Sequence, residues 1–254
     1  MYKETVSAIA RAAKGKADFL RKNPWGYFLA SALAGAYIGF GVLLAFTIGG
    51  LLSGEPYAKV MMGVSFGIAL SLVVIAGAEL FTGNNLVMSC GALEKAVTWT
   101  QAVRLWGVCW VGNLAGAVLL ALAFRFSGLF SGSAEAFMLA SATAKMTAPP
   151  LALFFRGVLC NALVCLAVWC GFRCQSESGK LIMVFWCLFA FITSGFEHSV
   201  ANMTLLTLAL FSPGGAAFLG GWLYNLLVVT LGNMAGGILC VALPYWIMSG
   251  KGRE

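Results

Sequence analysis

The sequence is poor in charge. Asp, Glu, Lys and Arg make up 10% of its 254 residues, whereas soluble globular proteins carry about 25%. Hydrophobic residues make up 61%, and the mean hydropathy is +0.91. Too few polar side chains remain to cover a body of 26.8 kDa with a water-compatible surface. The composition therefore excludes a soluble enzyme and indicates an integral membrane protein.

Histidine is almost absent, since His198 is the single one in the chain. This excludes a haem or zinc centre with two histidine ligands, and an ammonium channel with two pore histidines does not fit. The eight cysteines form no C-x-x-C pair and lie mostly in apolar stretches, so we interpret them as free thiols in a reduced environment. We therefore expect no metal, no cofactor and no catalytic residue.

Two other classes of membrane protein lack their signatures. A water channel should have paired Asn-Pro-Ala loops, and no Asn-Pro-Ala occurs in the chain. A membrane oxidoreductase subunit needs cofactor ligands, which one histidine and scattered cysteines do not supply. An oxidoreductase subunit is nevertheless kept as the alternative to a transport protein.

Long uncharged windows are what the sequence does contain. A helix needs about 20 residues to cross roughly 30 Å of hydrocarbon. The last window is too long for one span, and the turn at residues 212–215 divides it. The sequence therefore predicts an all-α integral membrane protein with six transmembrane helices. The windows are residues 25–54, 60–78, 105–124, 157–172, 181–196 and 199–250.

Positive charge is unequally divided between the predicted loops. If the first span starts in the cytoplasm, 12 of the 16 Lys and Arg residues fall on the cytoplasmic side. The positive-inside rule then places both termini in the cytoplasm. The net charge of +7 thus reflects topology, and we expect no nucleic-acid partner.

Three regions follow from this layout. Residues 1–23 are predicted to form a cytoplasmic amphipathic helix, residues 24–248 the six-helix channel domain, and residues 249–254 a short cytoplasmic tail. Two interpretations of the amphipathic helix stand side by side: it closes the cytoplasmic mouth of a pore, or it lies on the lipid headgroups. Its apolar positions are Val6, Ile9, Ala10, Ala13, Ala17 and Leu20.

The chain contains an internal repeat. Residues 111–119 match residues 231–239, and Gly77-Ala78-Glu79 matches Gly195-Phe196-Glu197. Each half then holds three spans, an odd number, so the two three-helix repeats are inverted relative to one another, as in many transporters.

The second span of each half is interrupted by polar residues. The interruptions cover residues 79–85 in the first half and 193–202 in the second. Non-helical backbone at membrane depth is tolerated only where it is buried in protein or lines a cavity. The second and fifth helices are therefore predicted to be broken, with a pore at the repeat interface.

Three ionisable residues lie deepest in the predicted spans: Glu79, Glu197 and His198. The glutamates directly precede the breaks, where a carboxylate that accepts backbone N–H bonds would brace the following loop. His198 has no repeat counterpart, because Leu80 stands at the equivalent position. An imidazole with an unperturbed pKa near 6.5 suits a proton or hydrogen-bond donor in a pore, and a satisfied core histidine is the alternative.

Other polar residues precede or interrupt the apolar stretches. Lys145 precedes the fourth span, either as a cation that raises the local anion concentration or as an interfacial anchor. Thr82, Asn161, Asn202 and Asn233 each need a polar partner, which a pore would provide. All five are candidate pore or substrate residues.

Four segments, residues 77–83, 160–169, 195–203 and 230–233, resemble the formate/nitrite transporter family. The resemblance extends over residues 23–246, and residues 144–149 and 197–204 are closer to its nitrite-channel branch. It implies a homopentamer of aquaporin-like protomers, each with its own pore, that passes small monovalent anions across the bacterial cytoplasmic (inner) membrane.

The resemblance also implies roles for single residues. Lys145 would lie in a vestibule, His198 at the pore centre, and Thr82 on a mobile loop between half-helices. Formate channels of the family carry Asp where this chain has Glu79, so the bracing of that loop differs. The implied constrictions are Phe66 and Phe191 on the periplasmic side, and Leu70, Leu80 and Phe81 on the cytoplasmic side.

We therefore expect a channel or transporter for nitrite, with formate and hydrosulfide as alternative substrates. We do not expect an enzyme. Its partners are a small anion, a proton, the lipid bilayer and further copies of the chain. A bare anion loses its hydration in an apolar neck at great cost. His198 is expected to share or donate a proton so that the neutral acid passes. In a weaker form of this hypothesis, His198 only hydrogen-bonds an anion that stays charged.

Overall fold

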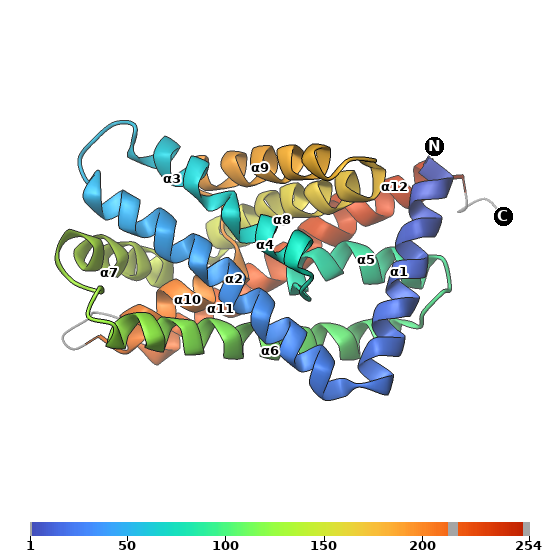
Figure 1. Ribbon diagram of the computed structural model, residues 1–254, viewed down its shortest axis with the longest axis horizontal. Coiled ribbons are helices and arrows are strands. Elements are labelled where there is room, and N and C mark those ends of the chain that lie inside the picture. The colour runs from blue at the N-terminus through green and yellow to red at the C-terminus, as the bar shows by residue number, and fades with distance from the viewer. Residues whose placement is uncertain (1, 213–217, 251–254) are drawn as a thin grey trace.

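The computed structural model describes residues 2–212 and 218–250, and every regular element within these ranges is a helix (Figure 1). The predicted all-α class is confirmed. The predicted turn at 212–215 lies largely outside the described residues. In chain order the helices are α1 (Tyr2–Lys22), α2 (Pro24–Leu51), α3 (Ala58–Phe66), α4 (Ile68–Ala76), α5 (Phe81–Leu93), α6 (Trp99–Phe126), α7 (Gly132–Thr147), α8 (Pro150–Arg173), α9 (Glu177–Thr193), α10 (Ser199–Leu210), α11 (Leu219–Gly237), the π-helical turn η1 (Ile238–Ala242) and α12 (Leu243–Met248).

The described helices form a bundle of membrane-spanning segments. Five are long and apolar enough to cross a bilayer: Pro24–Leu51, Ala58–Ala76, Trp99–Phe126, Pro150–Arg173 and Leu219–Met248. The predicted fifth span consists of the two shorter helices α9 and α10. Many large apolar side chains lie exposed on the outside of the bundle, where lipid tails are their natural solvent. The chain is thus a multi-pass membrane protein, while the count of six spans and the inversion of the halves stay predictions.

Both interruptions are present, but they are shorter than the sequence suggested. The first covers residues 77–80 and the second residues 194–198. Each contains a glycine with a left-handed backbone: Gly77, the first residue of the first interruption, has φ 77°, and Gly195, the second residue of the second, has φ 75°. Glu79, Glu197 and His198 lie in these interruptions, whereas the predicted polar residues that come after them do not lie in a loop. They form the first turns of α5 and α10, where helix N–H groups need acceptors.

Glycines allow the long helices to approach closely. A Cβ atom on Gly116 of α6 would collide with the carbonyl oxygen of Ala32 on α2, and one on Gly236 of α11 would collide with that of Val158 on α8. The repeated G-x-x-x-G segments therefore pack helices within one chain, α2 against α6 and α8 against α11.

Helices α1 and α7 lie at opposite ends of the bundle (Figure 1). Helix α1 crosses its end at a steep angle to the long helices and turns an apolar face, including Val6, Ile9 and Ala13, toward them. The ring of Tyr2 contacts that of Tyr245 in α12, at 6.0 Å between centroids. The described chain therefore begins and ends on one side of the bundle, called here the α1 end, and the opposite side is called the α7 end.

Candidate functional site

Three cavities follow one another through the protomer. An α1-end vestibule of about 520 Å³ is lined by residues that include Lys16, Glu79 and Leu80. A central cavity of about 10 Å³ shares Leu80 with this vestibule. An α7-end cavity of about 30 Å³ includes Lys145 and shares His198 with the central cavity. The shared lining residues place the three cavities in one row between the two ends of the bundle, and this row is called here the path.

Two apolar pairs separate the cavities. Leu70 and Leu80 line both the vestibule and the central cavity. Phe66 and Phe191 line both the central and the α7-end cavity, with ring centroids 5.4 Å apart in an edge-on arrangement. Phe81, expected beside the leucines, is not among the residues that line these three cavities. It is the first residue of α5, and its backbone N–H is held by Asn113.

His198 lies at the N-terminus of α10 and is 3% exposed. Its Nδ1 accepts the backbone N–H of Ala201 at 3.0 Å. A backbone N–H can only donate, so Nδ1 carries no proton and the neutral ring is protonated at Nε2. The Nε2 atom lies 3.0 Å from Thr82 Oγ1, which therefore accepts this hydrogen. The tautomer of His198 is thus fixed by its role as a helix cap.

Thr82 does not lie on a loop. It belongs to the first turn of α5 and is fully buried. Its backbone carbonyl accepts the side-chain amide of Asn161 at 3.3 Å and the Cys165 thiol at 3.4 Å. Thr82 therefore lines none of the three cavities and contacts the path only by its hydrogen bond to His198. Side chains of α8 hold its backbone in place.

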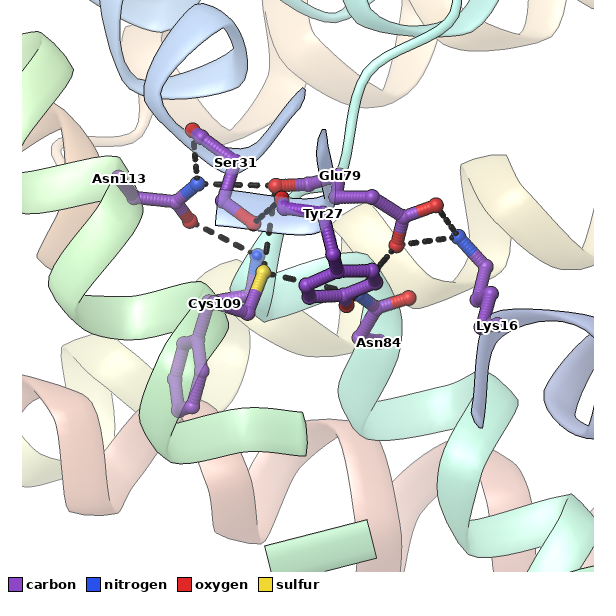
Figure 2. A network of polar contacts seen from close by, with 8 residues as sticks. Lys16, Tyr27, Ser31, Glu79, Asn84, Cys109 and Asn113 are labelled. Atoms are coloured by element: carbon purple, nitrogen blue, oxygen red, sulfur yellow. Dashed lines mark hydrogen bonds and ion pairs between the residues drawn. The ribbon is translucent and has the colours of Figure 1, made fainter. Parts of the chain in front are cut away.

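The carboxylate of Glu79 is the centre of a polar network at the α1 end (Figure 2). Lys16 Nζ lies 2.6 and 2.7 Å from its two oxygens. Tyr27 donates its hydroxyl to Oε2 at 3.1 Å, and Asn84 donates its amide at 3.0 Å. We expected this carboxylate to accept backbone N–H groups, and this was wrong, because its hydrogen-bond donors are side chains of α1, α2 and α5.

Glu197 forms the corresponding network at the α7 end. Lys145 Nζ lies 2.7 Å from both carboxylate oxygens, and Asn202 donates its amide to Oε2 at 2.7 Å. The Glu197 side chain is 4% exposed and that of Lys145 is 19% exposed. Neither interpretation of Lys145 as a free cation or a plain anchor describes this contact, because a buried carboxylate offsets its charge.

Two asparagines brace the backbone of the breaks in the same way. Asn113 donates to the carbonyl of Glu79 at 2.9 Å and accepts the N–H of Phe81 at 2.9 Å. Asn233 donates to the carbonyl of Glu197 at 2.9 Å and accepts the N–H of Ser199 at 2.9 Å. The assignment of Asn233 to the pore is thus corrected, since its amide is consumed by backbone groups.

The other two predicted pore amides are also braces. The Asn202 amide has two hydrogens, and Glu197 Oε2 and Asn225 Oδ1 accept them at 2.7 and 2.8 Å. Asn202 lines the α7-end cavity without a hydrogen to spare. Asn161 is fully buried and donates to the carbonyl of Asn233 at 2.7 Å. Of the predicted polar pore residues, His198 and Lys145 therefore keep a cavity-lining position with a hydrogen-bond donor.

Five residues of these networks were not predicted: Lys16, Tyr27, Asn84, Asn113 and Asn225. For Lys16 the signal was spacing. Positions 6, 9, 13, 16 and 20 recur every three or four residues on the buried face of α1, so a lysine there needs a buried partner. For Asn113 the signal was the repeat, which pairs it with Asn233. Among the described residues, no cluster of His, Cys, Asp and Glu is arranged to hold a metal ion.

Comparisons with known proteins agree with this arrangement. A family model described as Formate/nitrite transporter matches residues 3–247. The nitrite transporter NirC of Salmonella typhimurium is 42% identical over 257 residues, which cover 100% of this chain and 94% of that protein. A solved structure of an FNT family ion channel superposes with a TM-score of 0.92 at 42% identity, covering 96% of this chain and 98% of the other. A pentameric formate channel with formate bound gives a TM-score of 0.80 at 30% identity, covering 90% and 98%.

Proposed function

The chain belongs to the formate/nitrite transporter family, and we propose that it conducts nitrite as its neutral acid through the path of three cavities. It is a transport protein and not an enzyme, as its relatives are transporters and channels. The observation that carries the proposal is the position of His198. Among the described residues that line the central cavity, His198 alone has a polar side chain.

The apolar pairs favour a neutral permeant. A charged anion between Leu70 and Leu80, or between Phe66 and Phe191, would lose most of its hydration, which costs far more than any single hydrogen bond returns. A neutral acid of three heavy atoms loses much less. The central cavity of about 10 Å³ has room for about one water molecule at most, so the acid passes only when the apolar pairs move apart, and it then crosses in contact with His198.

The fixed tautomer defines what His198 offers. Its Nε2–H is a hydrogen-bond donor that must release Thr82 to hold the permeant. Outright transfer of that hydrogen would leave an imidazolate, so His198 shares it in a hydrogen bond, while the acid keeps the proton that the anion took up from the bulk solution. Flux then rises as the pH falls on the side from which the anion arrives.

The assembly and orientation belong to the same proposal. We assign the protein to the bacterial cytoplasmic membrane as a homopentamer with a pore in each protomer, supported by a pentameric structural neighbour. The distribution of Lys and Arg supports a cytoplasmic α1 end with both termini there. The vestibule is then the cytoplasmic mouth, and the Lys145 network faces the periplasm.

The test is nitrite flux into proteoliposomes with wild type and the His198→Phe variant, at two external pH values. We expect the variant to lose flux by at least about a hundredfold, since one donor and the space beside it are both removed, while size-exclusion chromatography shows an unchanged assembly. Undiminished, pH-independent flux in the variant contradicts the role of His198. Electrogenic current in the wild type identifies an anion that stays charged.

Formate is the second candidate, because formate is bound in a related structure that is 30% identical. Parallel flux assays with nitrite, formate and hydrosulfide, at equal concentration and two pH values, rank the three. Absorbance of the purified protein separates the remaining alternative, since a haem or flavin band would indicate an oxidoreductase subunit.

A further inference from the structure

Helix α7 ends in front of two prolines, and this leaves carbonyl groups without their usual partners. The carbonyl of Lys145 would normally accept the N–H of residue 149, and that of Met146 the N–H of residue 150. Both of these residues are prolines, which have no N–H. The helix turn that presents Lys145 to Glu197 therefore lacks two of its own hydrogen bonds.

Helix α11 supplies donors from outside. Asn225 donates its side-chain amide to the carbonyl of Lys145 at 2.9 Å. The preceding residue, Tyr224, donates its hydroxyl to the carbonyl of Ala148 at 2.8 Å. Two adjacent side chains of α11 thus hold the end of α7.

Asn225 differs from Tyr224 in a second contact. Its Oδ1 accepts one hydrogen of the Asn202 amide at 2.8 Å, and the other hydrogen of that amide goes to Glu197 Oε2 at 2.7 Å. With both hydrogens assigned, the orientation of the Asn202 amide is fixed. Asn225 is fully buried and is not among the residues that line the α7-end cavity, so it acts on the path only through its neighbours.

We propose that Asn225 is a positioning residue of the α7-end network. One amide group holds the backbone of Lys145 with its nitrogen and the side chain of Asn202 with its oxygen. It thereby sets the contact between the Lys145 ammonium and the Glu197 carboxylate beside the α7-end cavity. Resting on the proposed function, the consequence is that Asn225 sets the apparent affinity of this cavity for the arriving anion.

The experiment compares Asn225→Leu with Tyr224→Phe, which removes the neighbouring bond to the end of α7 but leaves Asn202 untouched. The first readout is the nitrite concentration that gives half-maximal flux into proteoliposomes. We expect it to rise about tenfold in Asn225→Leu, as loss of one or two hydrogen bonds predicts, with maximal flux within about twofold of wild type. In Tyr224→Phe we expect the half-saturating concentration to stay within about twofold.

The second readout needs no transport. A small amine-reactive reagent is applied from the α7 end, and labelling of Lys145 is read by mass spectrometry. We expect faster labelling in Asn225→Leu than in wild type, because the ammonium leaves Glu197, and no change in Tyr224→Phe. If the wild type carries no saturable nitrite flux, the proposed function has failed, and the labelling still decides the positioning role.

Two results overturn the positioning role. One is an Asn225→Leu protein with wild-type half-saturation and labelling. The other is an equal change in Asn225→Leu and Tyr224→Phe, which assigns both residues merely to closing the end of α7. If Asn225→Leu does not assemble, Asn225→Ser is measured against the same two criteria, because its hydroxyl is too short to hold both neighbours.

Discussion

The networks around Glu79 and Glu197 consist of similar parts in different settings. In each, a glutamate lies in a helix break, a lysine contacts both carboxylate oxygens, and an asparagine five residues later donates to the carboxylate. Asn113 and Asn233 brace the backbone of the two breaks through matching atoms. The polypeptide thus solves the problem of a broken helix twice with one device.

The position after each glutamate differs. Leu80 caps α5 without a side-chain bond, while His198 caps α10 through Nδ1, and of these two residues of the central cavity only His198 is polar. The cations also differ in origin, because Lys16 comes from α1 and Lys145 from the end of α7. Both halves thus hold their helix break with the same set of hydrogen bonds. The polar chemistry of the central cavity comes from His198, which only one half has.

Removing each carboxylate in turn should give the largest difference in stability between the α7-end and the α1-end network. Glu197→Ala leaves the Lys145 ammonium without its partner in a buried site, so we expect a loss of about 3–5 kcal/mol of stability. Glu79→Ala should cost about 2 kcal/mol, because Lys16 reaches the water-accessible vestibule. Thermal unfolding of both variants in detergent, followed by fluorescence, measures the difference. Equal losses would remove the distinction between the two ends.

The two bracing asparagines should instead be equivalent. Asn113→Leu and Asn233→Leu each remove three hydrogen bonds to buried backbone groups, for an expected cost of about 3 kcal/mol in either case. The same unfolding assay applies, with Asn84→Leu as a control that spares the backbone groups. A cost confined to one of the two asparagines contradicts a shared brace.

Leu80→His copies the imidazole into the other half. A histidine there can accept the N–H of Gly83 through Nδ1, as His198 accepts that of Ala201, and its polar edge then faces the leucine constriction. A gain of about 1 kcal/mol from one added hydrogen bond to the passing acid corresponds to a roughly fivefold larger nitrite flux into proteoliposomes. Leu80→Met is the matched control, for which we expect an unchanged nitrite flux.

Lys16→Met should have the smallest effect. The Glu79 carboxylate keeps Tyr27 and Asn84, and the apolar face of α1 stays packed, so we expect a loss of about 1 kcal/mol. Limited proteolysis within α1 should be modestly faster than in the wild type. Lys145→Met is the counterpart at the α7 end, and we expect it to lose more stability than Lys16→Met. A smaller loss in Lys145→Met than in Lys16→Met would contradict this expectation.

Part of the site could be read from the chain, and part could not. The repeat pointed to Glu79 and Glu197, and the failure of the repeat at the next position pointed to His198. The amides Asn161, Asn202 and Asn233 were found as polar residues in apolar stretches, but of the three only Asn202 lines a cavity, and all three hold protein groups. An amide in an apolar stretch of sequence must have a hydrogen-bond partner, but the sequence does not show whether that partner is a permeant or a backbone carbonyl.

The sequence by itself determined the membrane class, the helical class and the places where two helices break, because hydropathy and a glycine before a polar run act over a few neighbouring residues. The tertiary structure alone decided which lysine meets which carboxylate, since Lys16 and Glu79 lie 63 positions apart and Lys145 and Glu197 lie 52 apart. It also decided the tautomer of His198, which depends on the direction of a single backbone N–H. Such contacts are set by the packing of whole helices, and no local pattern in the chain encodes them.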